Sequence, residues 1–164
     1  MQIRVAAAVE VERPPGEVYD FAVAEASFPR LVHALGPIPG IVRVEMEGGR
    51  PLERGAQRRV TMSDGSEVLE EVLDAERPRR HRYRWLRPPA PPFNLLVRTG
   101  EGDWRFSPAG GGTRVDWTYT FDLTSPLVYP LAAAALALFR RWMQRALDRL
   151  PGEMQRARPP SRPA

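Results

Sequence analysis

Lysine and cysteine are absent from the 164-residue sequence, and histidine occurs only twice. Without lysine, the chain has no Schiff-base lysine, no Walker-type phosphate-binding lysine and no Ser-Lys dyad. Without cysteine, it has no disulfide, no thiol nucleophile and no thiolate metal site. Two histidines are too few for a histidine-rich metal centre. These absences exclude much covalent and metal-dependent catalysis, and no metal or organic cofactor is expected.

The length and composition favour one folded domain. A chain of 164 residues, 43% hydrophobic and 27% charged, can bury a core of its own. We expect this domain to cover residues 1–152 and the Arg/Pro-rich residues 153–164 to form a flexible tail. The net charge is only +4, because 20 acidic residues oppose 24 arginines. The isoelectric point of about 10.3 is therefore weak evidence for an anionic partner.

No segment has the pattern of a signal peptide or a membrane anchor. The longest apolar run, residues 127–139, has 13 residues and includes Pro130, whereas a bilayer span needs about 20. Near the start of the chain, Glu10 and Glu12 interrupt the apolar residues before a signal-like core develops. We therefore expect a cytoplasmic protein without a transmembrane segment.

Hydrophobic periodicity predicts a strand, two short helices and then a series of antiparallel strands. Residues 2–12 alternate as a half-buried strand does. Pro14 and Pro15 favour a helix start, and Ser27 is the expected N-cap of a second helix over 27–35. Further strands are predicted at residues 41–47, 55–62, 66–75, 80–86, 95–106 and 114–123, with hairpin turns at Asp64-Gly65 and at 109–112.

The last predicted element is a long amphipathic helix with Ser125 as its N-cap. Arg141, Gln144, Arg145 and Asp148 lie on its polar side, and Pro151-Gly152 is expected to end it. The opposite side carries one apolar stripe, made of Ala132, Leu136, Phe139, Met143, Leu147 and Leu150. Only this helix is long enough to cover the sheet. The predicted fold class is therefore α+β, with an antiparallel sheet of about seven strands curved around the C-terminal helix.

The residues that open and close the predicted sheet resemble a known family. Residues 11–21 read VERPPGEVYDF, and residues 28–30 read FPR in the second helix. The last hairpin reads GDWRF at 102–106 and GTRVDW at 112–117. In this order and spacing, the motifs resemble the START-like (SRPBCC, helix-grip) superfamily, and most closely its polyketide cyclase/dehydrase-like branch. The resemblance covers about residues 1–150.

The resemblance implies a hydrophobic cavity between the sheet and the last helix. Members of the superfamily bind lipids, sterols, polyketides, quinones or plant hormones in that cavity. A minority are enzymes, aromatase/cyclases among them. The superfamily has no universal catalytic motif, so the resemblance assigns no catalytic residue here.

Aromatic residues alternate along three predicted strands, and the inward-facing set suits an apolar pocket with a few polar groups. The small side chains of residues 132–135 are expected to face the sheet without filling the space, and Gly100 and Gly102 are expected to leave gaps in a strand. The predicted ligand-binding residues are Tyr83, Trp85, Trp104, Trp117, Tyr119, Phe139 and Met143. The alternative is that these rings simply fill the core.

Candidates for acid–base chemistry are few. His33 and His81 are the only imidazoles, and an imidazole at a pocket mouth can transfer protons near neutral pH. Glu70, with Glu71 or Tyr83, could assist a dehydration or an aldol-type cyclisation. Ordinary structural histidines are more common than catalytic ones, so His33, His81 and Glu70 remain weak candidates.

A basic run with interleaved aromatic residues spans 77–87. Such a run can indicate single-stranded nucleic-acid binding. Strand alternation explains it more simply, because the arginines at 80, 82 and 84 then face outward and the residues between them face inward. We expect no specific nucleic-acid binding. The stiff Pro-rich loop 87–92 could either gate the cavity mouth or act as a rigid connector.

The leading prediction is a carrier or sensor that binds a hydrophobic or amphipathic small molecule, lipid-, polyketide- or quinone-like, in an internal cavity. The first alternative is a polyketide cyclase/dehydratase that uses histidine or carboxylate groups. The second is a protein-interaction domain with a filled core and a surface formed by residues 35–41 and the Pro-rich loop. The ligand, turnover and a homodimeric state are left open.

Overall fold

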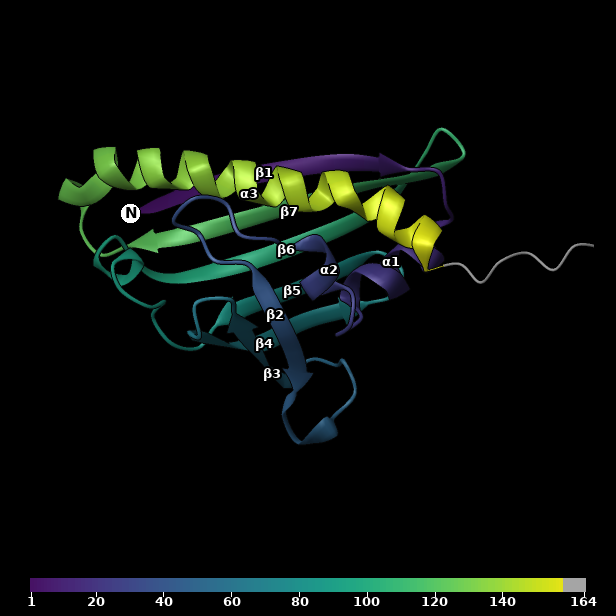
Figure 1. Ribbon diagram of the computed structural model, residues 1–164, viewed down its shortest axis with the longest axis horizontal. Helices are drawn as coiled ribbons and strands as arrows, with labels where there is room; N and C mark the ends of the chain where they lie inside the picture. The colour runs from purple at the N-terminus through teal and green to yellow at the C-terminus, as the bar shows by residue number, and fades with distance from the viewer. Residues whose placement is uncertain (158–164) are drawn as a thin grey trace, which may run out of the picture.

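A seven-stranded antiparallel sheet curves around one long helix in the computed structural model, which describes residues 1–157 (Figure 1). The sheet order is β1-β7-β6-β5-β4-β3-β2, so the chain meanders from β2 to β7 and β1 lies beside β7. The predicted fold class is confirmed. The strands are β1 (Gln2–Val11), β2 (Ile41–Met46), β3 (Gln57–Met62), β4 (Glu67–Glu76), β5 (Arg80–Trp85), β6 (Val97–Ala109) and β7 (Gly112–Leu123).

Two helices follow β1, and the second is shorter than the sequence predicts. The helices of the fold are α1 (Pro15–Val23), α2 (Phe28–Leu31) and α3 (Tyr129–Arg156), with 3-10 turns η1 (Glu47–Gly49), η2 (Phe93–Leu95) and η3 (Pro126–Val128). The expected helix over 27–35 is a single turn, and the Ser27 side chain does not cap it. The chain leaves α2 early because residues 35 and 38 form a β-bridge and Ile41 N–H donates to the Val32 carbonyl.

The long helix α3 lies along β1 (Figure 1). Gln144 Nε2 donates to the Ala8 carbonyl at 2.8 Å, and Arg140 Nε donates to the Ala6 carbonyl at 3.0 Å. These side chains cover the free edge of β1, which would otherwise expose unpaired backbone groups. The apolar stripe of α3 is buried, as predicted. No helix among residues 1–157 combines the length and the apolar character that a bilayer crossing needs.

The two ends of α3 differ from the prediction. Ser125 caps the turn η3, where its hydroxyl accepts from Leu127 N–H at 3.2 Å, rather than α3 itself. The helix continues through Pro151 to Arg156, so its expected end at Pro151-Gly152 is wrong. An interior proline costs about 3 kcal/mol, and here an ion pair between Arg30 and Glu153, at 2.7 Å, holds the last turn. Residues 153–156 of the expected tail are thus helical, and residues 158–164 lie outside the described part.

The inner face of the sheet is aromatic, as the alternation predicts. His81, Tyr83 and Trp85 of β5 are buried, and the arginines between them are half-buried or exposed. The expected gaps at Gly100 and Gly102 are wrong, because aromatic rings occupy that space. A Cβ on Gly100 would lie 2.9 Å from the Phe121 ring, and one on Gly102 would overlap the Tyr83 ring. Glycine is required at both positions for these rings to pack.

The outer face of the sheet pairs the basic run with carboxylates. Arg80 Nη2 lies 2.8 Å from Asp103 Oδ2, and Arg84 Nη2 lies 2.7 Å from Glu71 Oε2. Arg82 bridges Asp74 and Glu101. The strand part of the run, residues 80–84, is therefore an ion-paired sheet surface rather than a row of free cations.

Candidate ligand-binding pocket

A cavity of about 480 Å³ lies between α3 and the sheet at the end where α3 begins. The strands contribute Val60, Val68, Glu70, Trp85 and Tyr119, and the helix contributes Leu131, Ala135, Leu138, Phe139 and Trp142. Two loops complete the walls, at residues 37–39 and 89–96. This volume lies within the range of sites that enclose a small organic molecule.

The sequence of α3 explains why the cavity lies at this end. Four alanines lie in the first two turns of the helix, at residues 132–135, of which Ala132 is buried and Ala135 lines the cavity. Ala134 is exposed, so the expectation that residues 132–135 all face the sheet is wrong. Larger side chains outside the cavity follow along the helix, Met143 and Leu147 among them. The space between helix and sheet therefore opens toward the helix start.

Three of the seven predicted ligand-binding residues, Trp85, Tyr119 and Phe139, line the cavity. The Pro-rich loop reaches the same space, and the Phe93 ring that follows it stacks on Phe139 with centroids 6.2 Å apart. The loop predicted as a gate or connector is thus one wall of the cavity.

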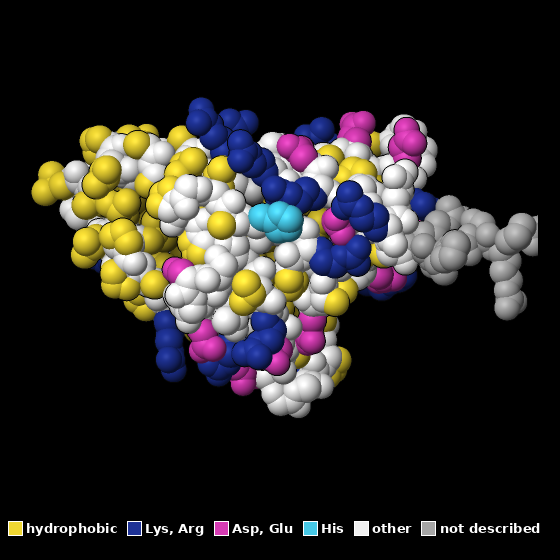
Figure 2. All heavy atoms as spheres, in the orientation of Figure 1, with side chains coloured by type: hydrophobic (Ala, Val, Ile, Leu, Met, Phe, Trp, Pro, Cys, Tyr) yellow, Lys and Arg dark blue, Asp and Glu magenta, His cyan; other side chains and the backbone are white. Residues whose placement is uncertain are grey.

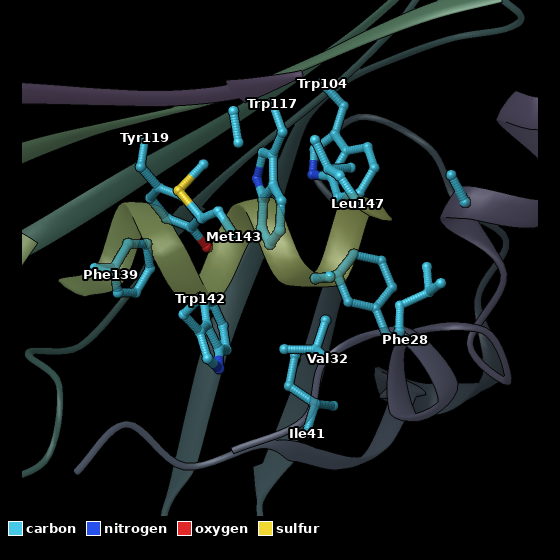
Figure 3. Close-up of a cluster of buried hydrophobic side chains, with 14 of the residues drawn as sticks. Phe28, Val32, Ile41, Trp104, Trp117, Tyr119, Phe139, Trp142, Met143 and Leu147 are labelled. Carbon is cyan, nitrogen blue, oxygen red and sulfur yellow. The ribbon is translucent and has the colours of Figure 1, made fainter. Parts of the chain in front are cut away.

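The other four, Tyr83, Trp104, Trp117 and Met143, do not line the cavity, which corrects the predicted lining. They belong to a closed cluster in which Phe28 and Leu147 pack near the two indoles (Figure 3). The ring centroids of Trp104 and Trp117 lie 4.6 Å apart. Both indole N–H groups donate to the Tyr83 hydroxyl, at 3.4 and 3.2 Å. Burial raises the pKa of that hydroxyl to about 12, so it remains protonated.

Sequence reasoning missed two aromatic wall residues, Trp142 and Phe93. Trp142 lies three residues after Phe139 and so shares its side of the helix, and its ring lies 4.9 Å from Phe139. Its indole N–H is buried and has no hydrogen-bond partner among residues 1–157. The helical spacing could have identified Trp142. Phe93 follows a run of prolines in which no periodic pattern exists.

A buried ion pair connects the cavity to the closed aromatic cluster. Arg58 Nε donates to Glu70 Oε2 at 2.6 Å, and both side chains are almost fully buried. The Arg58 guanidinium lies over the Tyr83 ring at 4.5 Å and over the Phe28 ring at 5.1 Å. Such contacts between a cation and an aromatic face are favourable in a desolvated setting. Glu70 lines the cavity, so a carboxylate faces walls that are otherwise mostly apolar.

The two charges stabilise each other against the effect of burial. Burial raises the pKa of Glu70, and the Arg58 guanidinium and the Trp85 indole oppose that rise. Burial alone would lower the pKa of Arg58, but the charge and hydrogen bond of Glu70, together with Tyr83 and Tyr119, outweigh it and the pKa of Arg58 is raised. Arg58 and Glu70 are direct partners across the β3–β4 hairpin, six residues before and six after Asp64. The hairpin turn in the sequence could therefore have identified Arg58.

Of the three weak catalytic candidates, only Glu70 lines the cavity. His33 is exposed and away from it. His81 is buried outside the cavity, and neither ring nitrogen has a hydrogen-bond partner among residues 1–157. Burial and the charge of Arg58 hold the pKa of His81 well below its usual range, so the ring is neutral. Glu71 pairs with Arg84 on the outer face.

Within residues 1–157, no three histidine, aspartate or glutamate side chains gather as a metal site would require. The arrangement offers a largely apolar enclosure with the exposed Asp64 and one buried carboxylate, Glu70, which can accept a hydrogen bond from a ligand. No imidazole of the described chain borders the cavity. Burial raises the pKa of the Tyr119 hydroxyl well above its usual value, so this wall residue is neutral as well.

Comparison with known proteins supports the fold and identifies the family. A family model described as "Polyketide cyclase / dehydrase and lipid transport" matches residues 2–155. No curated protein matches the sequence. Among solved structures, protein TTHA0849 from Thermus thermophilus is 25% identical, with a TM-score of 0.64 over 96% of this chain and 100% of that one.

Two further structures have the same fold at lower identity. Protein MLL2253 from Mesorhizobium loti is 14% identical, with a TM-score of 0.69 over 96% of this chain and 100% of the other. Ara h 8.0201 is 15% identical, with a TM-score of 0.68 over 95% of this chain and 99% of its own. Because the family model spans nearly the whole sequence, the chain belongs to the polyketide cyclase/dehydrase and lipid transport family of the SRPBCC superfamily.

Proposed function

We propose that the protein binds a hydrophobic or amphipathic small molecule in the cavity, as a carrier or sensor without turnover. The observation that carries the proposal is a space of about 480 Å³ whose walls are aromatic, aliphatic and proline side chains. Burial of apolar ligand surface against such walls contributes about 25 cal/mol per Å². The description of the family, which includes lipid transport, supports the same function.

The buried Glu70 carboxylate restricts which small molecules can bind in the cavity. Glu70 already accepts from Arg58 through Oε2, and its side chain lines the cavity. A guest whose inner end carries a hydroxyl or another hydrogen-bond donor can satisfy this group, whereas a purely hydrocarbon end would leave it desolvated. We therefore expect an amphipathic guest with an apolar body and one buried donor.

A cyclase or dehydratase is the second candidate, because Glu70 faces the cavity and the family description includes both activities. It ranks below the carrier because Glu70 is held by Arg58 and neither histidine borders the cavity. A protein-interaction domain ranks third, because that alternative assumes a filled core, whereas a cavity lies between α3 and the sheet.

The test of binding is a variant that fills the cavity. Ala135→Trp places an indole in the cavity, and Ala134→Trp places the same group on the exposed side of the same helix. The probe is 1-anilinonaphthalene-8-sulfonate, titrated by fluorescence. We expect Ala135→Trp to weaken its binding at least about tenfold, equivalent to one lost apolar contact of about 1.4 kcal/mol. Equal binding by both variants and by the wild type contradicts the proposal.

A second experiment separates a carrier from an enzyme. Protein purified from its own host is measured intact by native mass spectrometry, and the bound molecule is extracted and returned to fresh protein. A carrier releases the molecule unchanged. Conversion of the molecule, abolished by Glu70→Gln, assigns the enzyme instead.

A further inference from the structure

Hydrophobic side chains are concentrated on the surface around the cavity mouth. We define the apolar rim as Pro91, Pro92, Leu95, Leu127 and Leu131. Leu127 is 90% exposed, Leu95 is 68% exposed and Leu131 is 65% exposed. Figure 2 shows hydrophobic side chains gathered at the end of the molecule where α3 begins. Large exposed apolar patches on soluble proteins mark interaction sites.

The apolar rim is continuous with the cavity. All of its members except Leu127 line the cavity as well as the surface. Leu127 belongs to η3, which is tied to the η2 loop because Thr124 Oγ1 donates to the Leu95 carbonyl at 2.7 Å. An apolar guest that leaves the cavity therefore meets the rim first. In water, both the rim and the guest would then expose apolar surface.

Two arginines flank the segments that carry the apolar rim, and neither has a carboxylate partner within residues 1–157. Arg98 Nη2 donates to the Thr124 carbonyl at 2.9 Å, which places its charge beside η3. Arg87 follows β5 and opens the Pro-rich loop. Neither forms an ion pair within residues 1–157, unlike the arginines of the adjacent strand β5. The nearby carboxylates of Asp64 and Asp122 accept hydrogen bonds from Ser66 and Gln2.

We infer that the apolar rim docks on the surface of an anionic lipid bilayer, with Arg87 and Arg98 at the headgroups. Leucine and proline side chains can insert at the boundary between headgroups and acyl chains, and cations beside them are attracted to anionic lipids. A protein partner would match the apolar part equally well, but the two cations and the continuity with an apolar cavity favour lipid. The inference deepens the proposed function and rests on it, because docking brings the cavity mouth to the source of an apolar guest.

The test is co-sedimentation with vesicles of equimolar phosphatidylglycerol and phosphatidylcholine in 0.1 M salt. Leu127→Asp is compared with Val42→Asp, since Val42 is 54% exposed on β2 and away from the rim. We expect the wild type and Val42→Asp to sediment alike, and Leu127→Asp to bind at least about tenfold more weakly. Thermal unfolding confirms that both variants are folded.

The charge component has its own test. The double variant Arg87→Gln/Arg98→Gln is compared with Arg54→Gln, an exposed arginine before β3 with no ion pair within residues 1–157. Each arginine near an anionic surface contributes about fivefold to partitioning, so the double variant should lose about 25-fold. On vesicles of phosphatidylcholine alone, the double variant and the wild type should bind equally. Equal binding of the double variant and Arg54→Gln to anionic vesicles overturns the inference.

Dye binding in the absence of vesicles separates this inference from the proposed function. If Leu127→Asp binds 1-anilinonaphthalene-8-sulfonate normally but no longer sediments, both hold. If the wild type binds the dye and does not sediment with anionic vesicles, the docking inference is wrong and the binding function stands. If the wild type is a dimer that Leu127→Asp disperses, without vesicle binding, the rim is an interface between copies and the inference is overturned.

Discussion

The two ends of the space between α3 and the sheet differ in how it is filled. At the closed end, Trp104, Trp117 and Leu147 pack together under Phe28 of α2 (Figure 3). At the open end, Trp85 and similar rings border a cavity of about 480 Å³. Both ends carry aromatic residues on the inward side of their strands. A side chain on the inner face of the sheet is therefore buried at either end. Whether it can contact a ligand depends on which helices or loops cover that part of the sheet.

Different elements cover the inner face of the sheet at its two ends. Helices α1 and α2 cover the closed end with large side chains, and rings of Tyr19 and Phe106 meet there with centroids 5.2 Å apart. Over the open end, the loops at 37–39 and 89–96 take the place of α1 and α2, and the first turns of α3 contribute the small Ala135 among the larger wall residues. One end therefore contributes mainly to stability, and the other leaves space for a guest.

The largest expected effect lies at the boundary between the two ends. Glu70→Ala leaves the Arg58 charge buried without its partner, which typically costs about 3–5 kcal/mol of the free energy of unfolding. Urea unfolding measures the loss. Glu70→Gln keeps a hydrogen-bond acceptor beside Arg58 and should lose less. In Arg58→Met/Glu70→Leu the loss should largely disappear, because neither charge remains. If the double variant loses as much free energy of unfolding as Glu70→Ala, the cost does not come from an unpaired buried charge. The ion pair itself would then stabilise the fold relative to apolar side chains.

A matched pair of leucines on α3 compares the two ends directly. Leu147 is fully buried at the closed end, and Leu131 is 65% exposed at the open end. We expect Leu147→Ala to lower the free energy of unfolding by about 2–5 kcal/mol because it leaves a cavity. Leu131→Ala should change it by less than about 0.5 kcal/mol. Comparable losses in urea unfolding would mean that the open end is packed as tightly as the closed one.

A smaller effect depends on pH and arises from His81. Its folded-state pKa is depressed, by burial first and by the Arg58 charge second, while the Asp74 backbone and the Asp103 charge act in the opposite direction. Above about pH 6.5 the ring is neutral in both folded and unfolded states and contributes nothing. Below that pH only the unfolded chain takes up the proton, so stability falls by up to about 1.4 kcal/mol per pH unit.

The control for this pH effect is His81→Leu. Urea unfolding of the wild type between pH 7 and pH 5 should show falling stability, and the variant should show a much flatter profile over the same range. Carboxylates with lowered pKa values, such as Asp103, lose their contribution at lower pH and do not interfere. Parallel profiles for the two proteins would show that His81 is not the group that titrates.

The sequence predicts the sheet and the long helix well because both depend on local periodicity. Alternation correctly identifies the inward side chains of β5, and the turn at Asp64-Gly65 is in its predicted place. The division into an open and a closed end depends on contacts between distant segments, such as Phe28 with Trp104, whose centroids lie 5.8 Å apart. No local pattern encodes that contact. The helix through Pro151 is missed for the same reason, since its last turn is held by Arg30 from α2.

The glycines illustrate how a local signal can mislead. From the sequence alone, Gly100 and Gly102 predict empty space beside their strand, because glycine carries no side chain. The rings of Phe121 and Tyr83, from the strands on either side of β6, occupy that space. The sheet order has to be known before the meaning of such a glycine can be inferred.

The four tryptophans provide the most direct test of where a guest binds, because two line the cavity and two lie at the closed end. In a ¹H–¹⁵N NMR titration with 1-anilinonaphthalene-8-sulfonate, the indole N–H signals of Trp85 and Trp142 should shift. Those of Trp104 and Trp117, which donate to the Tyr83 hydroxyl, should not move. Shifts confined to Trp104 and Trp117, or no shift at saturating probe, would contradict the account.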